Sequence, residues 1–172
     1  MEFAKLVASM DRFGRILPVL VSDISDEDAK WKPESGGWSI LEIVCHLADE
    51  EVEDFRMRVQ STLADPTTPW PAIDPESAAI ERNYNGQNLA HVVERFVRER
   101  NESVDWLRAL VDPDWESAYQ HPRFGPISVG VVMASWAVHD QLHLRQLAKR
   151  MFEMNVRDGL PYPTDYAGQW KA

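Results

Sequence analysis

Three of the five histidines stand in a pattern that could bind a metal ion. His139 and His143 are four residues apart, so on a helix both side chains lie on one face, with Cβ atoms about 5–6 Å apart. They share a stripe with Trp136 and Leu147, which predicts that they point into the protein. His46 lies far earlier in the chain, beside another apolar stripe, and supplies a third imidazole if the two helices pack together.

Three neutral imidazoles leave an open coordination position, which is typical of a catalytic rather than a closed structural metal site. Water or a substrate oxygen or thiol can take that position, so hydrolysis or group transfer is the expected chemistry. The spacing of His139 and His143 alone is more typical of two histidines that only pack or form hydrogen bonds. His46 is the residue that favours a metal site.

Glu50 and Gln146 are the candidate catalytic residues. Glu50 follows His46 by four residues, and it could accept a proton, orient water or ligate the metal. Gln146 follows His143 by three residues and could hold that imidazole by a hydrogen bond. A solvated carboxylate and an exposed amide are the simpler alternatives for the two residues.

Four other residues have side chains that could bind or react. Trp136, one turn before His139, is the candidate wall of a substrate pocket, although packing in the core explains it as well. Cys45 points about 100° away from its neighbour on the helix and is expected to be a small buried hydrophobe. His91 is expected at the surface, and His121 falls in a proline-rich loop without a partner at a useful spacing.

Helical periodicity runs through four long segments, and no segment shows the two-residue alternation of strands, which predicts an all-α fold. Pro18 is expected to kink the first helix. Ser39 with Glu42 forms a capping-box pattern for the second helix, and Ser128 is the expected N-cap of the fourth. Arg100 interrupts the third stripe and is expected to reach solvent or to pair with a carboxylate such as Glu50 or Glu53. The predicted helices span about 2–22, 39–63, 87–111 and 128–152, followed by a tail over 153–172.

Two segments resemble the signature segments of the DinB superfamily, whose members include the YfiT-like proteins. These are GWSILEIVCHLADE at residues 37–50 and HDQLHLRQL at residues 139–147. The resemblance implies a single four-helix bundle domain over the whole chain, of up-down-down-up type. It also implies a divalent metal, usually zinc or nickel, on His46, His139 and His143, and frequent homodimers. Characterised relatives include enzymes that use low-molecular-weight thiols, but many members have no assigned activity. The resemblance therefore selects no substrate.

Composition excludes some partners. The chain of 172 residues has 18 basic and 28 acidic residues, a net charge of −10, so it should repel nucleic acid and anionic lipid. The N-terminus does not read as a signal peptide, and no apolar run approaches the roughly 20 residues that span a bilayer. A single cysteine fits a reducing cytoplasm. A small-molecule substrate is therefore expected.

Two function classes follow from these residues. The first is a metal-dependent enzyme, either a hydrolase or a thiol-dependent transferase or isomerase. The second is a non-enzymatic binding or stress-response dimer in which the metal mainly joins two helices, which predicts a closed site with a fourth protein ligand such as Glu50. A metal-free module with merely packed histidines is the simplest alternative.

Overall fold

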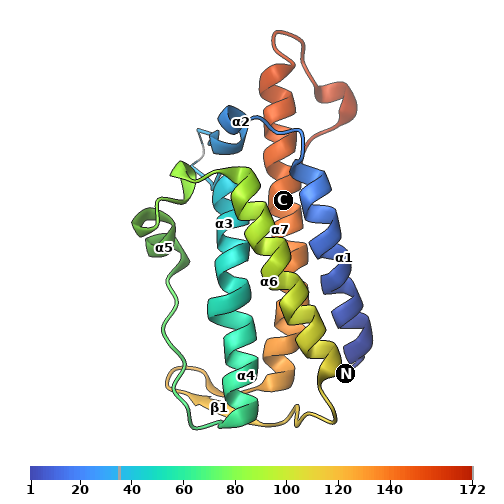
Figure 1. Ribbon diagram of the computed structural model, residues 1–172. Coiled ribbons are helices and arrows are strands. Elements are labelled where there is room, and N and C mark those ends of the chain that lie inside the picture. The colour runs from blue at the N-terminus through green and yellow to red at the C-terminus, as the bar shows by residue number, and fades with distance from the viewer. Residues whose placement is uncertain (35, 172) are drawn as a thin grey trace.

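A computed structural model describes residues 1–34 and 36–171 and shows four long helical rods side by side (Figure 1). The first, α1, spans Phe3–Val21, and the second consists of α3 (Ile40–Glu50), η1 (Glu51–Arg56) and α4 (Met57–Ala64). The third is α6 (Leu89–Ala109) and the fourth is α7 (Val129–Asp158). Followed along the chain, the rods run up, down, down and up. The predicted all-α bundle is therefore confirmed.

The long crossover between the two descending rods carries short elements. It contains α5 (Pro75–Glu81) and η2 (Tyr84–Gly86), while α2 (Asp26–Lys30) connects the first two rods and η3 (Asp165–Ala167) lies in the tail. The crossover returns the chain to the upper end of the bundle, as Figure 1 shows. Consequently α6 can descend beside α3, and α7 can rise beside both α1 and α3.

Local sequence sets the starts of these helices. Ser39 caps α3, and its hydroxyl and the Glu42 carboxylate form the expected reciprocal capping box. Ser128 caps α7 by accepting a hydrogen bond from the backbone N–H of Val131. Pro18 lies inside α1, which continues through it to Val21. The predicted caps are confirmed.

Two parts of the chain differ from expectation. The expected loop before α7 contains an antiparallel hairpin, β1 (Ala118–His121) and β2 (Gly125–Ser128), closed at Gly125 by a backbone with φ of 74° that favours glycine. Helix α7 runs to Asp158 rather than ending near residue 152, because no helix breaker occurs before Gly159. Arg157 in its last turn pairs with Asp28 at 2.6 Å. Ala172, the end of the predicted tail, lies outside the described residues.

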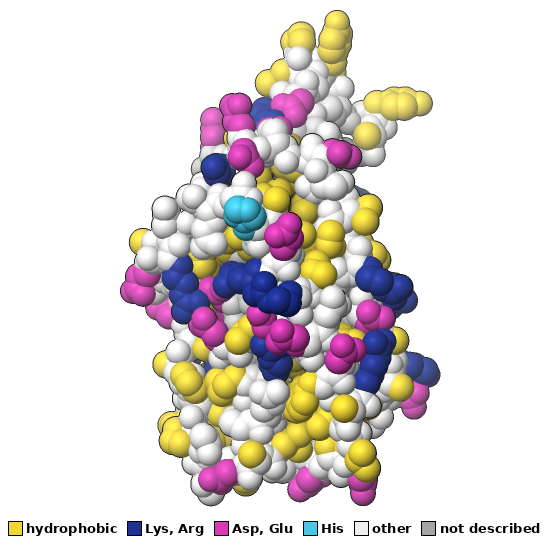
Figure 2. All heavy atoms as spheres, in the orientation of Figure 1, with side chains coloured by type: hydrophobic (Ala, Val, Ile, Leu, Met, Phe, Trp, Pro, Cys, Tyr) yellow, Lys and Arg dark blue, Asp and Glu magenta, His cyan; other side chains and the backbone are white. Residues whose placement is uncertain are grey.

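The interior holds two hydrophobic clusters with buried charge between them. One surrounds Phe13 and Phe96, and the other surrounds Met10 and Trp136. Arg100 touches both, since its guanidinium lies over the two phenylalanine rings and donates to the carbonyl of Met10. Acidic and basic side chains share a band across the face shown in Figure 2. Within the described chain, no helix has the length and apolar character needed to cross a membrane.

Candidate metal centre

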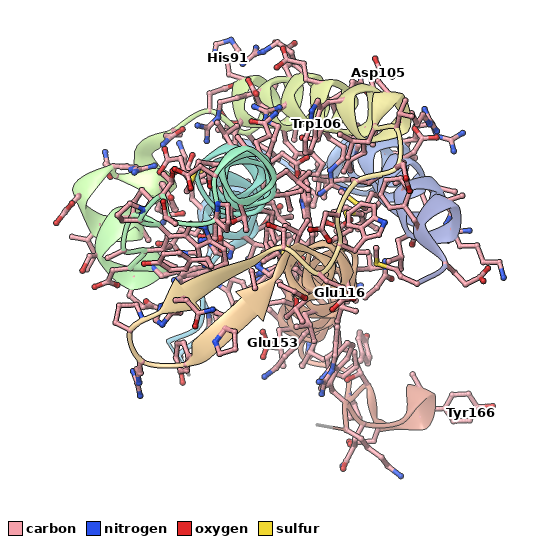
Figure 3. All side chains as sticks on the ribbon, turned by 90° about the horizontal axis from the view of Figure 1, so that it is seen from below. His91, Asp105, Trp106, Glu116, Glu153 and Tyr166 are labelled. Atoms are coloured by element: carbon pink, nitrogen blue, oxygen red, sulfur yellow. The ribbon has the colours of Figure 1, made fainter. Side chains whose placement is uncertain are left out.

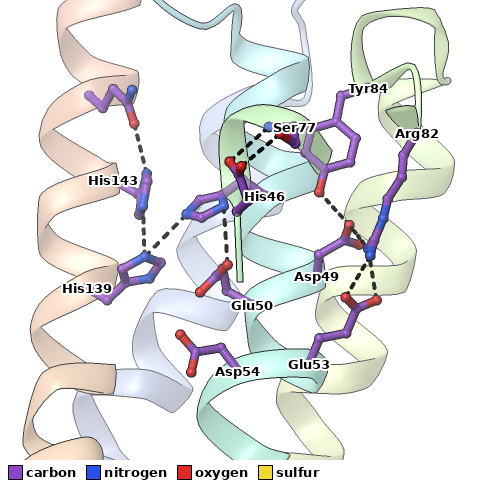
Figure 4. Close-up of polar contacts among 12 residues, drawn as sticks. His46, Asp49, Glu50, Glu53, Asp54, Ser77, Arg82, Tyr84, His139 and His143 are labelled. Atoms are coloured by element: carbon purple, nitrogen blue, oxygen red, sulfur yellow. Dashed lines mark hydrogen bonds and ion pairs between the residues drawn. The ribbon is translucent and has the colours of Figure 1, made fainter. Parts of the chain in front are cut away.

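The structure brings His46, His139 and His143 together between α3 and α7 (Figure 4). The Nε2 atoms of His46 and His139 are 3.3 Å apart, and those of His139 and His143 are 3.0 Å apart. All three donor nitrogens lie within 4.8 Å of one another. The spatial convergence that the metal hypothesis requires is therefore present.

The nitrogen separations fit a shared ion. Two nitrogens that each lie roughly 2.0–2.1 Å from one tetrahedral ion are about 3.3–3.4 Å apart. The observed separations of 3.3 and 3.0 Å are close to that value. Two unprotonated ring nitrogens at such a distance repel each other unless a cation or a proton lies between them. The donor set therefore fits a divalent metal ion.

Burial keeps these histidines neutral. Removal from water, followed by the charge of His143, lowers the pKa of His46 to about 3. Burial, followed by the charges of His143, His46 and Arg100, lowers the pKa of His139 to about 3. Burial also lowers the pKa of His143, against the effect of its hydrogen bond with Gln146. Neutral imidazole is the form that binds a metal, so the site is ready at neutral pH.

Gln146 orients His143. Its Oε1 lies 2.8 Å from Nδ1 of His143, and because an amide oxygen only accepts, Nδ1 carries the proton. The remaining nitrogen, Nε2, then has a free lone pair and points to the shared point. Outer hydrogen bonds of this kind fix the tautomer of metal-binding histidines. Gln146 is thus placed as a positioning residue.

Glu50 lies on the other side of His46 from the point where the Nε2 atoms meet. Its Oε1 is 3.7 Å from Nδ1 of His46, beyond a hydrogen bond but close enough to interact electrostatically. Burial, and then a hydrogen bond with Asp54, raises the pKa of Glu50. Burial also raises the pKa of Asp54, whose Oδ1 lies 2.7 Å from Nε of Arg58. Glu50 and its neighbour Asp54 are therefore buried acids with raised pKa values, and Glu50 lies beside His46.

The π-helix η1 explains why Asp54 faces this region and Glu53 does not. Regular helical spacing continues the face of His46 and Glu50 to Glu53. A π-helix closes its hydrogen bonds over five residues, so each residue turns through a smaller angle and the face moves on by about one position. Glu53 instead has a side chain 54% exposed and pairs with Arg82. The sequence carried no signal for this shift.

Aromatic rings enclose two of the histidines. The ring of Trp38 lies 4.9 Å from that of His46, and the ring of Phe55 lies 4.9 Å from that of His139. Trp136, the predicted pocket wall, is instead a core residue. It is 1% exposed and stacks under Phe55, and the two hollows that border His139 and His143 are lined by other residues. Its position on α7 directs its indole to the carboxylate of Glu51 rather than to the three histidines.

Arg100 neither reaches solvent nor pairs with Glu50 or Glu53. It is 1% exposed and donates to both carboxylate oxygens of Asp140, at 2.6 and 2.8 Å, and to Glu51 at 2.8 Å. Trp136 donates to the same oxygen of Glu51 at 3.0 Å. Asp140 follows a predicted metal ligand directly, so this cluster anchors the turn of α7 that carries the histidine.

The remaining candidates behave as expected with one exception. Cys45 is fully buried, which raises the pKa of its thiol to about 12, and His91 is exposed and points away from the bundle (Figure 3). His121 closes β1, and its Nδ1 accepts the backbone N–H groups of Arg123 and Phe124. It lines a cavity of about 560 Å³ that also borders Glu50. The unexpected hairpin brings it there.

Comparison with known proteins agrees with this fold. A sequence model described as the DinB superfamily matches residues 10–147. Two relatives from Oceanobacillus iheyensis, each named putative metal-dependent hydrolase, are 26% and 27% identical to the chain. The first match covers 77% of this chain and 76% of the relative, and the second covers 74% and 72%.

A solved structure shows the same architecture. YfiT from Bacillus subtilis, described as a probable metal-dependent hydrolase with an unusual four-helix bundle topology, superposes with a TM-score of 0.80 at 17% identity. The match covers 89% of this chain and 87% of YfiT, and it extends the agreement in fold beyond the part matched by sequence. With the family model covering most of its length, the chain belongs to the DinB superfamily.

Proposed function

We propose that this protein is a metal-dependent hydrolase whose ion is held by His46, His139 and His143. The observation that carries the proposal is the composition of the cluster. Among the described histidines, cysteines and acids, only these three place ligand atoms at one point. A site with three protein ligands keeps a position for substrate, whereas a structural site is closed by four.

This ligand set favours the hydrolase over the non-enzymatic dimer. The dimer hypothesis expects a fourth ligand such as Glu50, but that carboxylate approaches Nδ1 of His46 at 3.7 Å rather than the Nε2 atoms. The names of the two relatives from Oceanobacillus iheyensis support hydrolysis as well. We propose that the enzyme assembles as a homodimer, and we assign the second subunit no role in the reaction.

The residues of the chain have separate roles in this proposal. A divalent ion held by the three histidines would supply Lewis-acid chemistry for a substrate oxygen or for water near neutral pH. Gln146 holds His143 in the metal-binding tautomer. Glu50, beside Nδ1 of His46 and next to Asp54, holds a proton on the side of that imidazole away from the Nε2 atoms and can exchange it through His46 or solvent. Trp38 and Phe55 limit the access of water to the two imidazoles beside them.

Imidazole suits zinc and nickel alike, so both ions belong in the test. Metal-free protein is reloaded with Zn²⁺ or Ni²⁺ and assayed on a panel of esters, amides and thioesters. A parallel panel contains a low-molecular-weight thiol with an electrophile, because a thiolate can occupy the same open position. Hydrolysis that requires the added ion is the expected result.

A matched pair of variants controls this assay. His139→Ala removes a proposed ligand, and His91→Ala removes an exposed histidine that points away from the bundle. The first should abolish ion-dependent turnover, and the second should leave it unchanged. Turnover that appears only with the thiol would reassign the protein to transfer chemistry. Equal turnover by both variants would rule out the histidine centre.

A further inference from the structure

A second feature of the metal centre is a hollow on the outer side of its third histidine. The hollow measures about 660 Å³ and lies between α7 and the C-terminal tail. Its lining residues are Leu142, His143, Arg145, Gln146, Lys149 and Trp170. Such a volume is typical of a site for a small molecule. Because one wall is a proposed metal ligand, a molecule bound there lies against the imidazole of His143.

The charge of this hollow is positive in a protein of net charge −10. Arg145 has no acidic group within 4.0 Å in the described part of the chain, and Lys149 reaches only Glu153, at 4.0 Å. Glu153 is held more closely by Arg150, at 2.5 Å. Two cations over the site are therefore left largely without counter-charge, and they attract an anion.

The other walls are apolar. Trp170 comes from the tail, and its ring packs 5.6 Å from that of Phe152, so the tail contacts the outer face of α7. Leu142 is 59% exposed on the same face. It also lines a second hollow of about 380 Å³ beside His139 and Phe55. Apolar surface thus continues past both histidines of α7.

We infer that the hollow binds a small amphipathic anion. A carboxylate or a similar acidic group pairs with Arg145 and Lys149, and the apolar part lies against Trp170 and Leu142. This inference rests on the proposed function, because it identifies the anion as the substrate class of the same centre. Charge at one end and an apolar body at the other match the two kinds of wall.

The test uses two probes that differ only by an acidic group. 1-Anilinonaphthalene-8-sulfonate is an amphipathic anion, and N-phenyl-1-naphthylamine has the same aromatic body without the sulfonate. Charge reversal by Arg145→Glu with Lys149→Glu should weaken binding of the anion by about tenfold, since a charge-assisted contact is lost. Binding of the neutral probe should change little. Trp170→Ala should weaken the binding of both probes, because both share the aromatic body.

Two control variants carry the same changes elsewhere. Lys5→Glu with Arg15→Glu reverses two charges on α1, where the side chains are 79% and 72% exposed. Tyr166→Ala removes an aromatic ring that projects from the tail into solvent (Figure 3). Both controls should bind the two probes as the parent does. The inference fails if the charge reversals on α1 and on α7 weaken binding of the anionic probe equally. It also fails if neither charge reversal weakens that binding.

Elemental analysis of the same samples separates this inference from the proposed function. About one ion per chain with no binding of the anionic probe at Arg145 and Lys149 would overturn the inference alone. Selective binding of that probe by a protein that retains no ion would leave the anion site in place and overturn the metal-dependent hydrolase.

Discussion

Two buried polar clusters share α7 but differ in how their charges and donors are satisfied. In the first, Arg100 donates to Asp140, Glu51 and the carbonyl of Met10, so one buried cation is paired with two acids within the chain. In the second, the histidines direct Nε2 atoms at one another, and in the described chain no acid reaches their common point. The charged groups of the first cluster find partners of opposite charge within the chain, although Nε of Arg100 and Oε1 of Glu51 have no hydrogen-bond partner among the described residues. The donor atoms of the second cluster call for a cation from outside.

The contrast shows how a bundle can prepare a metal site. Helix α7 is fixed by the ion pair of Arg100 and Asp140, one residue from His139. The histidines can then be held close together without counter-charges, although the approach of three neutral rings contributes little stability by itself. Stability and ligand binding are thus supplied by separate neighbouring groups, and each can be tested separately.

The largest expected effect comes from breaking the cluster of Arg100, Glu51 and Asp140. Arg100→Met leaves Glu51 and Asp140 as buried charges without a partner, which should lower the free energy of unfolding by about 3–5 kcal/mol. Urea denaturation measures it. Arg108→Met is the control, because Arg108 is 52% exposed beside Asp11 and should cost no more than about 1 kcal/mol. Equal losses of unfolding free energy in the two variants would contradict a special role for the buried arginine.

Completing the histidine cluster should have the next largest effect. An ion that binds only the folded state, at about one hundred times its dissociation constant, raises the free energy of unfolding by about 2.7 kcal/mol. Denaturation with and without Zn²⁺ should show this gain for the parent. His143→Ala should show none, while Arg100→Lys, where it folds, should retain it. A gain of the same size in His143→Ala would place the ion elsewhere.

A smaller change is expected when the support of a ligand is removed. Gln146→Leu takes away the oxygen that lies 2.8 Å from Nδ1 of His143. The loss of such an outer hydrogen bond should weaken metal binding by about 10–100-fold without abolishing it. Competition titration against a chelator measures the change. Gln141→Leu, an exposed glutamine on the same helix, is the control and should leave the affinity unaltered.

The smallest expected effect is a change in stability caused by packing against Arg100. Gly14 lies inside α1, and a Cβ atom there would lie 2.9 Å from Cγ of Arg100, whose position the ion pairs fix. Alanine normally stabilises a helix interior relative to glycine by roughly 0.5–1 kcal/mol. Gly14→Ala should nevertheless destabilise this protein, by about 1 kcal/mol net of that gain.

A double-mutant cycle tests the cause of this reversal. In an Arg100→Ala background the clashing Cγ atom is gone, so Gly14→Ala should become neutral or stabilising. Destabilisation of the same size in both backgrounds would show that the contact with Arg100 is not responsible.

Sequence patterns predicted most of the fold because its determinants are local. The apolar stripes gave the four long helices, and the Ser39 and Glu42 pair marked the start of α3. The histidine hypothesis combined a local spacing, His139 with His143, with the position of His46 beside the apolar stripe of another helix. The family resemblance pointed to the same three residues. The structure brings these residues together, although their role as ligands remains a prediction.

The parts that sequence reasoning missed depend on contacts between distant segments. The π-helix that turns Asp54 and Phe55 toward the centre involves one altered turn, which periodicity does not reveal. The burial of Arg100 depends on acids contributed by two other helices. Likewise, His121 borders a cavity only because a hairpin forms where a loop was expected.

The central claim is that the three histidines hold one ion, and direct metal counting tests it. Metal-free protein should be incubated with Zn²⁺ or Ni²⁺, freed of excess ion and analysed for metal per chain. The parent and His91→Ala should each retain about one ion, and His143→Ala should retain close to none. A parent that keeps no ion, or a His143→Ala variant that keeps as much as the parent, would contradict the account.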